Sequence, residues 1–64
     1  MSGGTLYAGV DAGSATTKAV LTDAAGAVRG SAVVPSGARL ADAAARALDA
    51  ALHAAGAARG DVAR

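Results

Sequence analysis

Alanine supplies most of the apolar residues in this chain, and that limits the core it can build. Hydrophobic residues make up 53% of the sequence, yet Tyr7 is the one aromatic residue and there is no cysteine. Alanine buries little surface, and 64 residues is already short for an independent domain without disulfides or a metal. We therefore expect residues 1–64 to be the N-terminal part of a larger domain, with the rest of that domain absent.

The charges are balanced and spread along the chain. The formal net charge is +1 at pH 7, with acidic and basic residues interspersed. This balance argues against nucleic acid or an anionic membrane as a partner. No apolar run approaches the roughly 20 residues that span a bilayer, and residues 1–7 lack the basic and apolar regions of a secretory signal. We therefore expect a cytoplasmic protein.

Three short segments have the composition of β-strands. The first, about 6–11, is a mostly apolar run bounded by glycines, and the second, about 17–22, is rich in β-branched residues. The third, about 27–34, ends before Pro35, which cannot donate a hydrogen bond to a ladder. Glycine-containing turn signals separate the segments. The pattern predicts an antiparallel β-meander.

After Pro35 the apolar periodicity changes from two to 3.6, which predicts an amphipathic α-helix over about 39–55. Gly56 is expected to cap its C-terminus. The apolar face is predicted to consist of Leu40, Ala44, Leu48, Ala51, Leu52 and Ala55. The expected fold class is therefore α/β, a meander followed by one helix.

The opposite face of this helix carries the charged residues. Spacing of i,i+4 predicts one ion pair between Asp42 and Arg46 and a second between Asp49 and His53. His53 is the single histidine, and its place among these charges predicts a solvent-facing side chain. No residue of the chain is assigned a catalytic role.

The segment from Asp11 to Lys18 carries the residue types that bind phosphate. Consecutive backbone N–H groups in a turn form a nest that binds anions, and a lysine ammonium adds positive charge. The predicted cofactor-binding residues are Gly13, Ser14, Ala15, Thr16, Thr17 and Lys18. Asp11 would repel a phosphate unless a cation lay between them, which predicts Mg²⁺ beside Asp11.

The common glycine-rich nucleotide motifs are not present. The chain has no G-x-x-x-x-G-K-[ST], and no G-x-G-x-x-G that opens a helix, because a strand follows this loop. A phosphate loop between two antiparallel strands is a different solution. The alternative interpretation is an ordinary polar hairpin turn, in which Asp11 caps the turn and Lys18 is simply solvated.

Residues 9–21, Gly-Val-Asp-Ala-Gly-Ser-Ala-Thr-Thr-Lys-Ala-Val-Leu, resemble the first phosphate motif of a large ATPase superfamily. That superfamily joins acetate and sugar kinases, heat-shock chaperone ATPases and actin. The best match within it is the BadF/BadG/BcrA/BcrD type, which comprises the ATPase components of benzoyl-CoA reductases and the activators of 2-hydroxyacyl-CoA dehydratases. The resemblance continues through residues 35–37, an alanine-rich helix ending at Gly56, and Asp61-Val62.

This resemblance implies the start of a ribonuclease H-like, actin-type ATPase domain. The loop amides and Lys18 would hold the β- and γ-phosphates of ATP, with Asp11 near Mg²⁺. It further implies a homodimer with a 4Fe–4S cluster, which docks on an acyl-CoA dehydratase or reductase and couples ATP hydrolysis to low-potential electron transfer. The chain has no cysteine, so the cluster ligands are not carried over. In the family, a strand and a second glycine-rich motif come next.

Two further hypotheses stay open. An N-acetylglucosamine kinase-like sugar kinase of the same superfamily would use the same loop to phosphorylate a hydroxyl group. A non-catalytic truncated module would have no retained nucleotide binding. Phosphoryl transfer needs positioning from both sides of a cleft, and this chain supplies one wall. We therefore expect residues 1–64 alone to be inactive as an ATPase and to bind ATP weakly.

Overall fold

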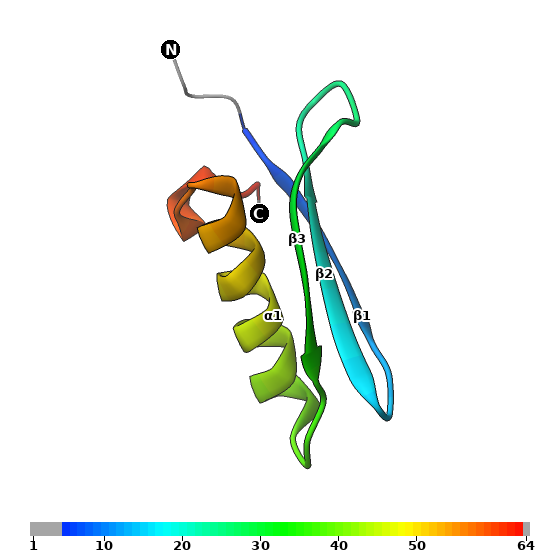
Figure 1. Cartoon of the computed structure of the whole chain (residues 1–64). Helices are drawn as coiled ribbons and strands as arrows, with labels where there is room; N and C mark the ends of the chain where they lie inside the picture. The colour runs from blue at the N-terminus through cyan, green and yellow to red at the C-terminus, as the bar shows by residue number, and fades with distance from the viewer. Residues whose placement is uncertain (1–4, 64) are drawn as a thin grey trace.

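The computed structural model of the chain describes residues 5–63 and shows a three-stranded sheet with one helix packed on one face (Figure 1). The elements are β1 (Tyr7–Ala12), β2 (Thr16–Thr22), β3 (Val28–Pro35), α1 (Leu40–Ala55) and a single 3-10 turn, η1 (Arg59–Asp61). The predicted α/β mixture, the antiparallel meander and the single α-helix are confirmed. The expectation about a secretory signal falls partly on residues 1–4, which lie outside the described residues.

The strand and helix boundaries differ from the predicted ones by one residue at most ends, for local reasons. Leu6 precedes β1 because it pairs with Val62 instead of with β2. Ala27 belongs to the turn before β3, since its N–H and C=O groups both bond to Asp23. Arg39 has extended backbone angles and is the N-cap of α1 rather than its first residue.

The strand order is β1-β2-β3, and β2 in the centre is the strand that carries the core. Thr17, Ala19 and Leu21 alternate along β2, and each is 0% exposed because it faces α1. Their neighbours along the strand point to the other side of the sheet, away from the helix. We call that side the open face, because no described element covers it (Figure 1).

The face of α1 that packs on the sheet agrees only in part with the predicted one: Ala51 and Leu52 are buried, and Leu48 and Ala55 pack beside them, as predicted. The buried helix residues are Ala43, Ala47, Ala51 and Leu52, whereas Leu40 is 48% exposed. Alanine therefore supplies three of these four buried residues, and of the predicted leucines Leu52 is buried, Leu48 is partly buried and Leu40 is exposed. In a helix with alanine on nearly every side, periodicity alone does not identify which alanines meet the sheet.

Small residues let α1 and the sheet approach closely. A methyl group added to Gly30 of β3 would lie 2.6 Å from the carbonyl oxygen of Ala51 and 2.9 Å from Cβ of Ala55. Neither distance is compatible with van der Waals contact. The core is therefore thin, and its larger members are Leu21 and Leu52.

Neither predicted ion pair on the helix is present. Asp42 pairs with Arg39, at 3.6 Å, and not with Arg46. Arg46 instead reaches toward the sheet and donates a hydrogen bond to the Pro35 carbonyl oxygen at 3.2 Å. That carbonyl lies at the end of β3, so Arg46 links the helix to the last residue of the strand.

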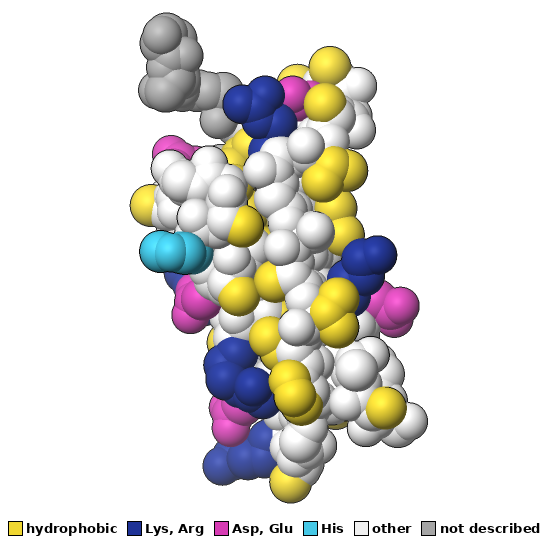
Figure 2. Space-filling model, in the orientation of Figure 1, with side chains coloured by type: hydrophobic (Ala, Val, Ile, Leu, Met, Phe, Trp, Pro, Cys, Tyr) yellow, Lys and Arg dark blue, Asp and Glu magenta, His cyan; other side chains and the backbone are white. Residues whose placement is uncertain are grey.

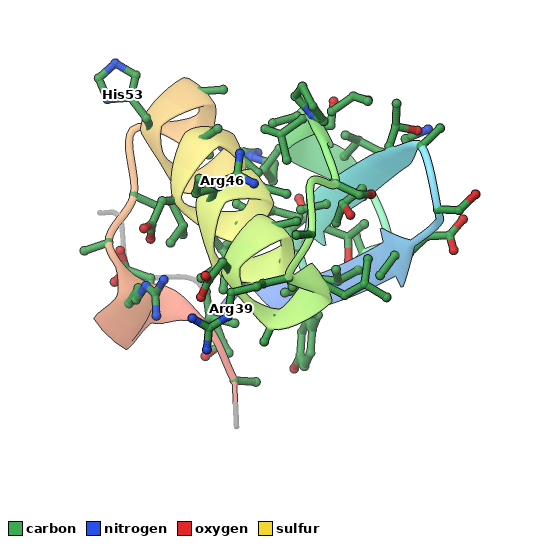
Figure 3. The ribbon with its side chains drawn as sticks, turned by 90° about the horizontal axis from the view of Figure 1, so that it is seen from below. Arg39, Arg46 and His53 are labelled. Carbon is green, nitrogen blue, oxygen red and sulfur yellow. The ribbon has the colours of Figure 1, made fainter. Side chains whose placement is uncertain are left out.

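Asp49 is paired with Arg59 rather than with His53. The Arg59 Nε donates to an Asp49 carboxylate oxygen at 2.8 Å, and this bond raises the pKa of the guanidinium above its ordinary value. His53 is exposed, as predicted, and points away from the sheet (Figure 3). Charged side chains therefore follow the outer side of α1, and apolar side chains are exposed along the sheet (Figure 2).

The chain returns to β1 after the helix. Gly56 ends α1 in the left-handed region, with φ of 68°, as the sequence predicts. The Leu6 N–H then donates to Asp61 O, and the Ala63 N–H donates to Leu6 O, both at 2.8 Å. These bonds form a parallel bridge between Leu6 and Val62, which the sequence analysis did not predict. No helix within residues 5–63 is long and apolar enough to cross a bilayer.

Candidate functional site

The predicted phosphate loop is the turn between β1 and β2. It is short, because Gly13 to Ala15 connect the two strands and the Gly13 N–H donates to Thr16 O at 2.9 Å. The turn lies at the same end of the sheet as the connection from β3 to α1 (Figure 1). The structure therefore places the predicted loop between antiparallel strands, as the sequence indicates.

Asp11 and Lys18 lie directly opposite one another in the β1–β2 ladder. Side chains of directly opposed residues are on the same side of a sheet. Lys18 alternates with buried Thr17 and Ala19, so both charges project from the open face, and both residues are exposed. The three ion pairs found among the described residues do not include them, so within residues 5–63 neither charge is neutralised by a contact within 4.0 Å.

Two of the predicted amide donors have no partner among the described residues. The N–H groups of Ser14 and Ala15 donate no hydrogen bond to any atom of residues 5–63, and both residues are exposed. The Gly13 N–H differs, because the turn itself uses it. The N–H groups that can meet an anion at the tip of the turn are therefore those of Ser14 and Ala15.

The threonines of the loop lie on opposite sides of the sheet. Thr16 is exposed, so its hydroxyl group is accessible from solvent. Thr17 is 0% exposed, and its Oγ1 lies 2.8 Å from Oγ of Ser36. The Thr17 hydroxyl therefore points into the protein and contacts Ser36. It is not on the open face, where Lys18 lies.

Ser36 is a residue of this site that the sequence analysis left without a role. It is 0% exposed and hydrogen-bonds to three residues of the β1–β2 hairpin. The signal in the sequence was slight, since a serine between Pro35 and Gly37 is typical of any turn. Its role follows from the pairing of β3 with β2, which brings Ser36 beside Ala15.

The site offers a metal ion a single carboxylate. Among residues 5–63 no three His, Cys, Asp or Glu side chains gather closely enough to form a metal site. Mg²⁺ is commonly bound by one or two carboxylates, with substrate phosphates and water as the other ligands. Asp11 fits that arrangement, with a ligand phosphate supplying further oxygens. Its assignment as a metal-binding residue stays a prediction.

A hollow of the structure lies elsewhere. It measures about 200 Å³ and is lined by Leu48, Arg59, Val62 and Ala63. These residues belong to α1 and the C-terminal segment, whereas the phosphate-loop residues belong to β1 and β2. None of the residues that line this hollow therefore belongs to the predicted phosphate-binding loop.

The chain has no match among the protein families, the curated proteins and the solved structures with which it was compared. The resemblance of residues 9–21 to the first phosphate motif of actin-like ATPases therefore stays a prediction. The hairpin itself provides two opposed charges, two free amides and a turn whose backbone carbonyl groups accept hydrogen bonds from Ser36.

Proposed function

We propose that the hairpin from Asp11 to Lys18 binds the phosphates of Mg-ATP, and that the chain is the first part of a ribonuclease H-like, actin-type ATPase domain. The observation that carries the proposal is the position of Asp11 directly opposite Lys18 in the β1–β2 ladder. Both side chains are on the open face, beside the free amides of Ser14 and Ala15. A carboxylate next to phosphate donors is best explained by a cation between them.

In this proposal each predicted residue has a definite part. The amides of Ser14 and Ala15 bind phosphate oxygens, Lys18 neutralises their charge, and Asp11 holds Mg²⁺ directly or through water. Thr16 is on the accessible side and adds a hydroxyl donor. Thr17 and Gly13, whose hydrogen-bonding groups are engaged within the protein, support the turn.

The parallel bridge between Leu6 and Val62 supports the larger fold. It adds to the free edge of β1 a parallel neighbour that arrives after a helix. A strand–helix–strand connection of this kind is the unit from which α/β domains with parallel strands are built. In the family that the sequence resembles, a strand follows at this point of the chain. The bridge between Leu6 and Val62 is where that strand would begin.

The proposed activity of the whole domain is ATP hydrolysis coupled to low-potential electron transfer, in the cytoplasm, to an acyl-CoA dehydratase or reductase. It rests on the resemblance of residues 9–21 and on the hairpin geometry. The chain has no cysteine, so the ligands of the proposed 4Fe–4S cluster, which the homodimer would carry, must come from outside residues 1–64.

The test is a titration of the 64-residue chain with Mg-ATP, followed by ¹⁵N–¹H NMR. We expect weak binding, with a dissociation constant on the order of 1 mM, and the largest shifts at the amides of Ser14 and Ala15. Lys18→Ala should weaken binding about tenfold, the loss of one charge-assisted contact of about 1.4 kcal/mol. Asp11→Asn should remove the difference between ATP with and without Mg²⁺.

Arg29→Ala is the matched control. It removes the same charge, but Arg29 lies at the other end of the sheet, where it pairs with Asp23 at 3.6 Å. Equal losses from Lys18→Ala and Arg29→Ala would show non-specific attraction of an anion to a positive chain. That result, or shifts spread evenly over the sheet, would overturn the proposal.

A further inference from the structure

We propose that Ser36 is the positioning residue of the phosphate loop: it holds the turn so that the free amides face outward, ready for an anion. This inference rests on the proposed function and extends it to the residue that directly follows β3. Ser36 is 0% exposed, so in this proposal it acts through the backbone of Gly13 and Ala15 and not by touching the anion.

The contacts of Ser36 with the hairpin are three hydrogen bonds. Its hydroxyl group donates to Gly13 O at 2.5 Å, and its backbone N–H donates to Ala15 O at 3.0 Å. Its Oγ also lies 2.8 Å from Oγ1 of Thr17. We call these four residues, Gly13, Ala15, Thr17 and Ser36, the Ser36 clasp.

The direction of each hydrogen bond follows from the chemistry of the groups. A carbonyl oxygen can only accept, so the single hydroxyl hydrogen of Ser36 is used on Gly13. The hydrogen between Ser36 and Thr17 must then come from the Thr17 hydroxyl. Thr17 therefore donates to Ser36, which donates to Gly13, and the chain of donors ends on the backbone of the loop. Such chains are stronger than their separate members.

The clasp sets the orientation of the free amides through the geometry of the peptide bond. In a trans peptide the C=O group and the following N–H point in opposite directions. Holding Gly13 O toward Ser36 therefore turns the Ser14 N–H away from Ser36 and out of the protein. Holding Ala15 O in the same way fixes the far end of the turn. The Ser14 N–H has no partner of its own among residues 5–63, so the clasp is what orients it. The Ala15 N–H belongs to the Ser14–Ala15 peptide, which lies between the two peptides whose carbonyl groups Ser36 holds.

Ser36 is itself held firmly. Pro35 precedes it with a fixed φ and pairs with Thr16 in the ladder, and the Pro35 carbonyl accepts a hydrogen bond from Arg46 of α1. Gly37 follows in the left-handed region, with φ of 67°. A buried donor between two such neighbours has little freedom, so the position of the turn is tied to β3 and to the helix.

The test compares two variants with the unaltered 64-residue chain. Ser36→Ala removes the hydroxyl bond but leaves the Thr17 hydroxyl buried without a partner, which destabilises the fold. A double variant, Ser36→Ala with Thr17→Val, removes both hydroxyl groups and keeps the interior apolar, so it should remain folded. Ser31→Ala is the matched control, because Ser31 is an exposed serine on β3, the strand that directly precedes Ser36.

Two readouts are used, each at a temperature where circular dichroism shows the variant fully folded. The first is the ¹⁵N order parameter of the Ser14 and Ala15 amides, which should fall in the double variant and stay unchanged in Ser31→Ala. The second is the affinity for inorganic pyrophosphate with Mg²⁺, which should fall at least about threefold. A purely structural role for Ser36 would leave both readouts unchanged in a variant that is folded.

The outcomes separate the inference from the proposed function. A folded double variant whose turn and pyrophosphate affinity match those of the unaltered chain overturns the positioning role while the phosphate site stands. Loss of order without loss of affinity overturns it as well. If the unaltered chain does not bind pyrophosphate at all, the proposed function fails, and with it any role of Ser36 in positioning a phosphate site.

Discussion

Gly30 of β3 and Ala51 of α1 determine how closely the helix approaches the sheet. A methyl group on Gly30 would lie 2.6 Å from the Ala51 carbonyl oxygen, inside the contact distance of the two atoms. The obstacle is backbone, which cannot rotate away as the end of a side chain can. The helix therefore packs on β3 only because this position has no side chain.

The first prediction concerns this contact. Gly30→Ala should lower the free energy of unfolding by about 1–3 kcal/mol, because the helix must shift outward or the strand must bend. Gly9→Ala is the control, since nothing lies within 4 Å of a methyl group at Gly9. Urea denaturation measures both. A Gly30→Ala variant as stable as the Gly9→Ala variant would show that α1 does not pack on β3 at this distance.

The second prediction concerns Leu21, the largest fully buried side chain among residues 5–63. Leu21→Ala should cost about 2–5 kcal/mol. A core of this size rarely supplies more than about 3–5 kcal/mol, so we expect the variant to be largely unfolded by circular dichroism at 25 °C. Val33→Thr, at a position that is 60% exposed, should change the stability by no more than about 0.5 kcal/mol.

The third prediction concerns the end of α1. Gly56 has φ of 68°, and its N–H bonds to His53 O while the Ala57 N–H bonds to Leu52 O. Gly56→Ala should destabilise the fold by about 1–2 kcal/mol, because a side chain is strained in this region. Gly60→Ala, where the space is open and φ is ordinary, should have little effect on the thermal midpoint. Equal midpoints for the two variants would contradict the cap.

The fourth prediction concerns the pair formed by Asp49 and Arg59. The hydrogen bond to Asp49 raises the pKa of Arg59, so its contribution is fully present below the ordinary pKa of the guanidinium and is lost only as the pH rises above it. We therefore expect no change in this contribution across the neutral range. Arg59→Gln should speed hydrogen exchange of the Ala63 amide, which bonds to Leu6 O.

The comparison variant for this pair is Arg39→Gln. Arg39 pairs with Asp42 at the other end of the helix, so its loss should leave exchange at Ala63 unchanged. Added salt should reduce the difference between the Arg59→Gln variant and the unaltered chain, since the pair is exposed and screened. Exchange at Ala63 that responds equally to both substitutions would show that the Asp49–Arg59 pair does not hold the C-terminal segment.

Periodicity and turn chemistry predicted most of the fold. The three strands, the single helix and the cap at Gly56 follow from patterns that extend over several residues or from glycine in a left-handed position. The buried face of the helix followed only in part, because Ala51 and Leu52 are buried as predicted, whereas Ala43 and Ala47 are buried and Leu40 is exposed. Tertiary packing outweighed the leucine pattern.

The site was predictable to the extent that it is local. The opposition of Asp11 and Lys18 follows from a short turn between two strands, which the sequence indicates. Ser36 is distant in sequence from the loop it holds, so only the pairing of β3 with β2 reveals it. The predicted ion pair between Asp49 and His53 was wrong for a related reason. Arg59, in a turn beyond the helix, forms the ion pair with Asp49 instead.

The bridge between Leu6 and Val62 also has a consequence for the order of folding. The two hairpins join neighbours in the chain, so each can close early at a small entropic cost. Leu6 and Val62 lie near opposite ends of the chain, and their hydrogen bonds can form only after the helix has docked on the sheet. We therefore expect this bridge to close last and open first, so that the start of β1 and the end of the chain gain and lose protection together.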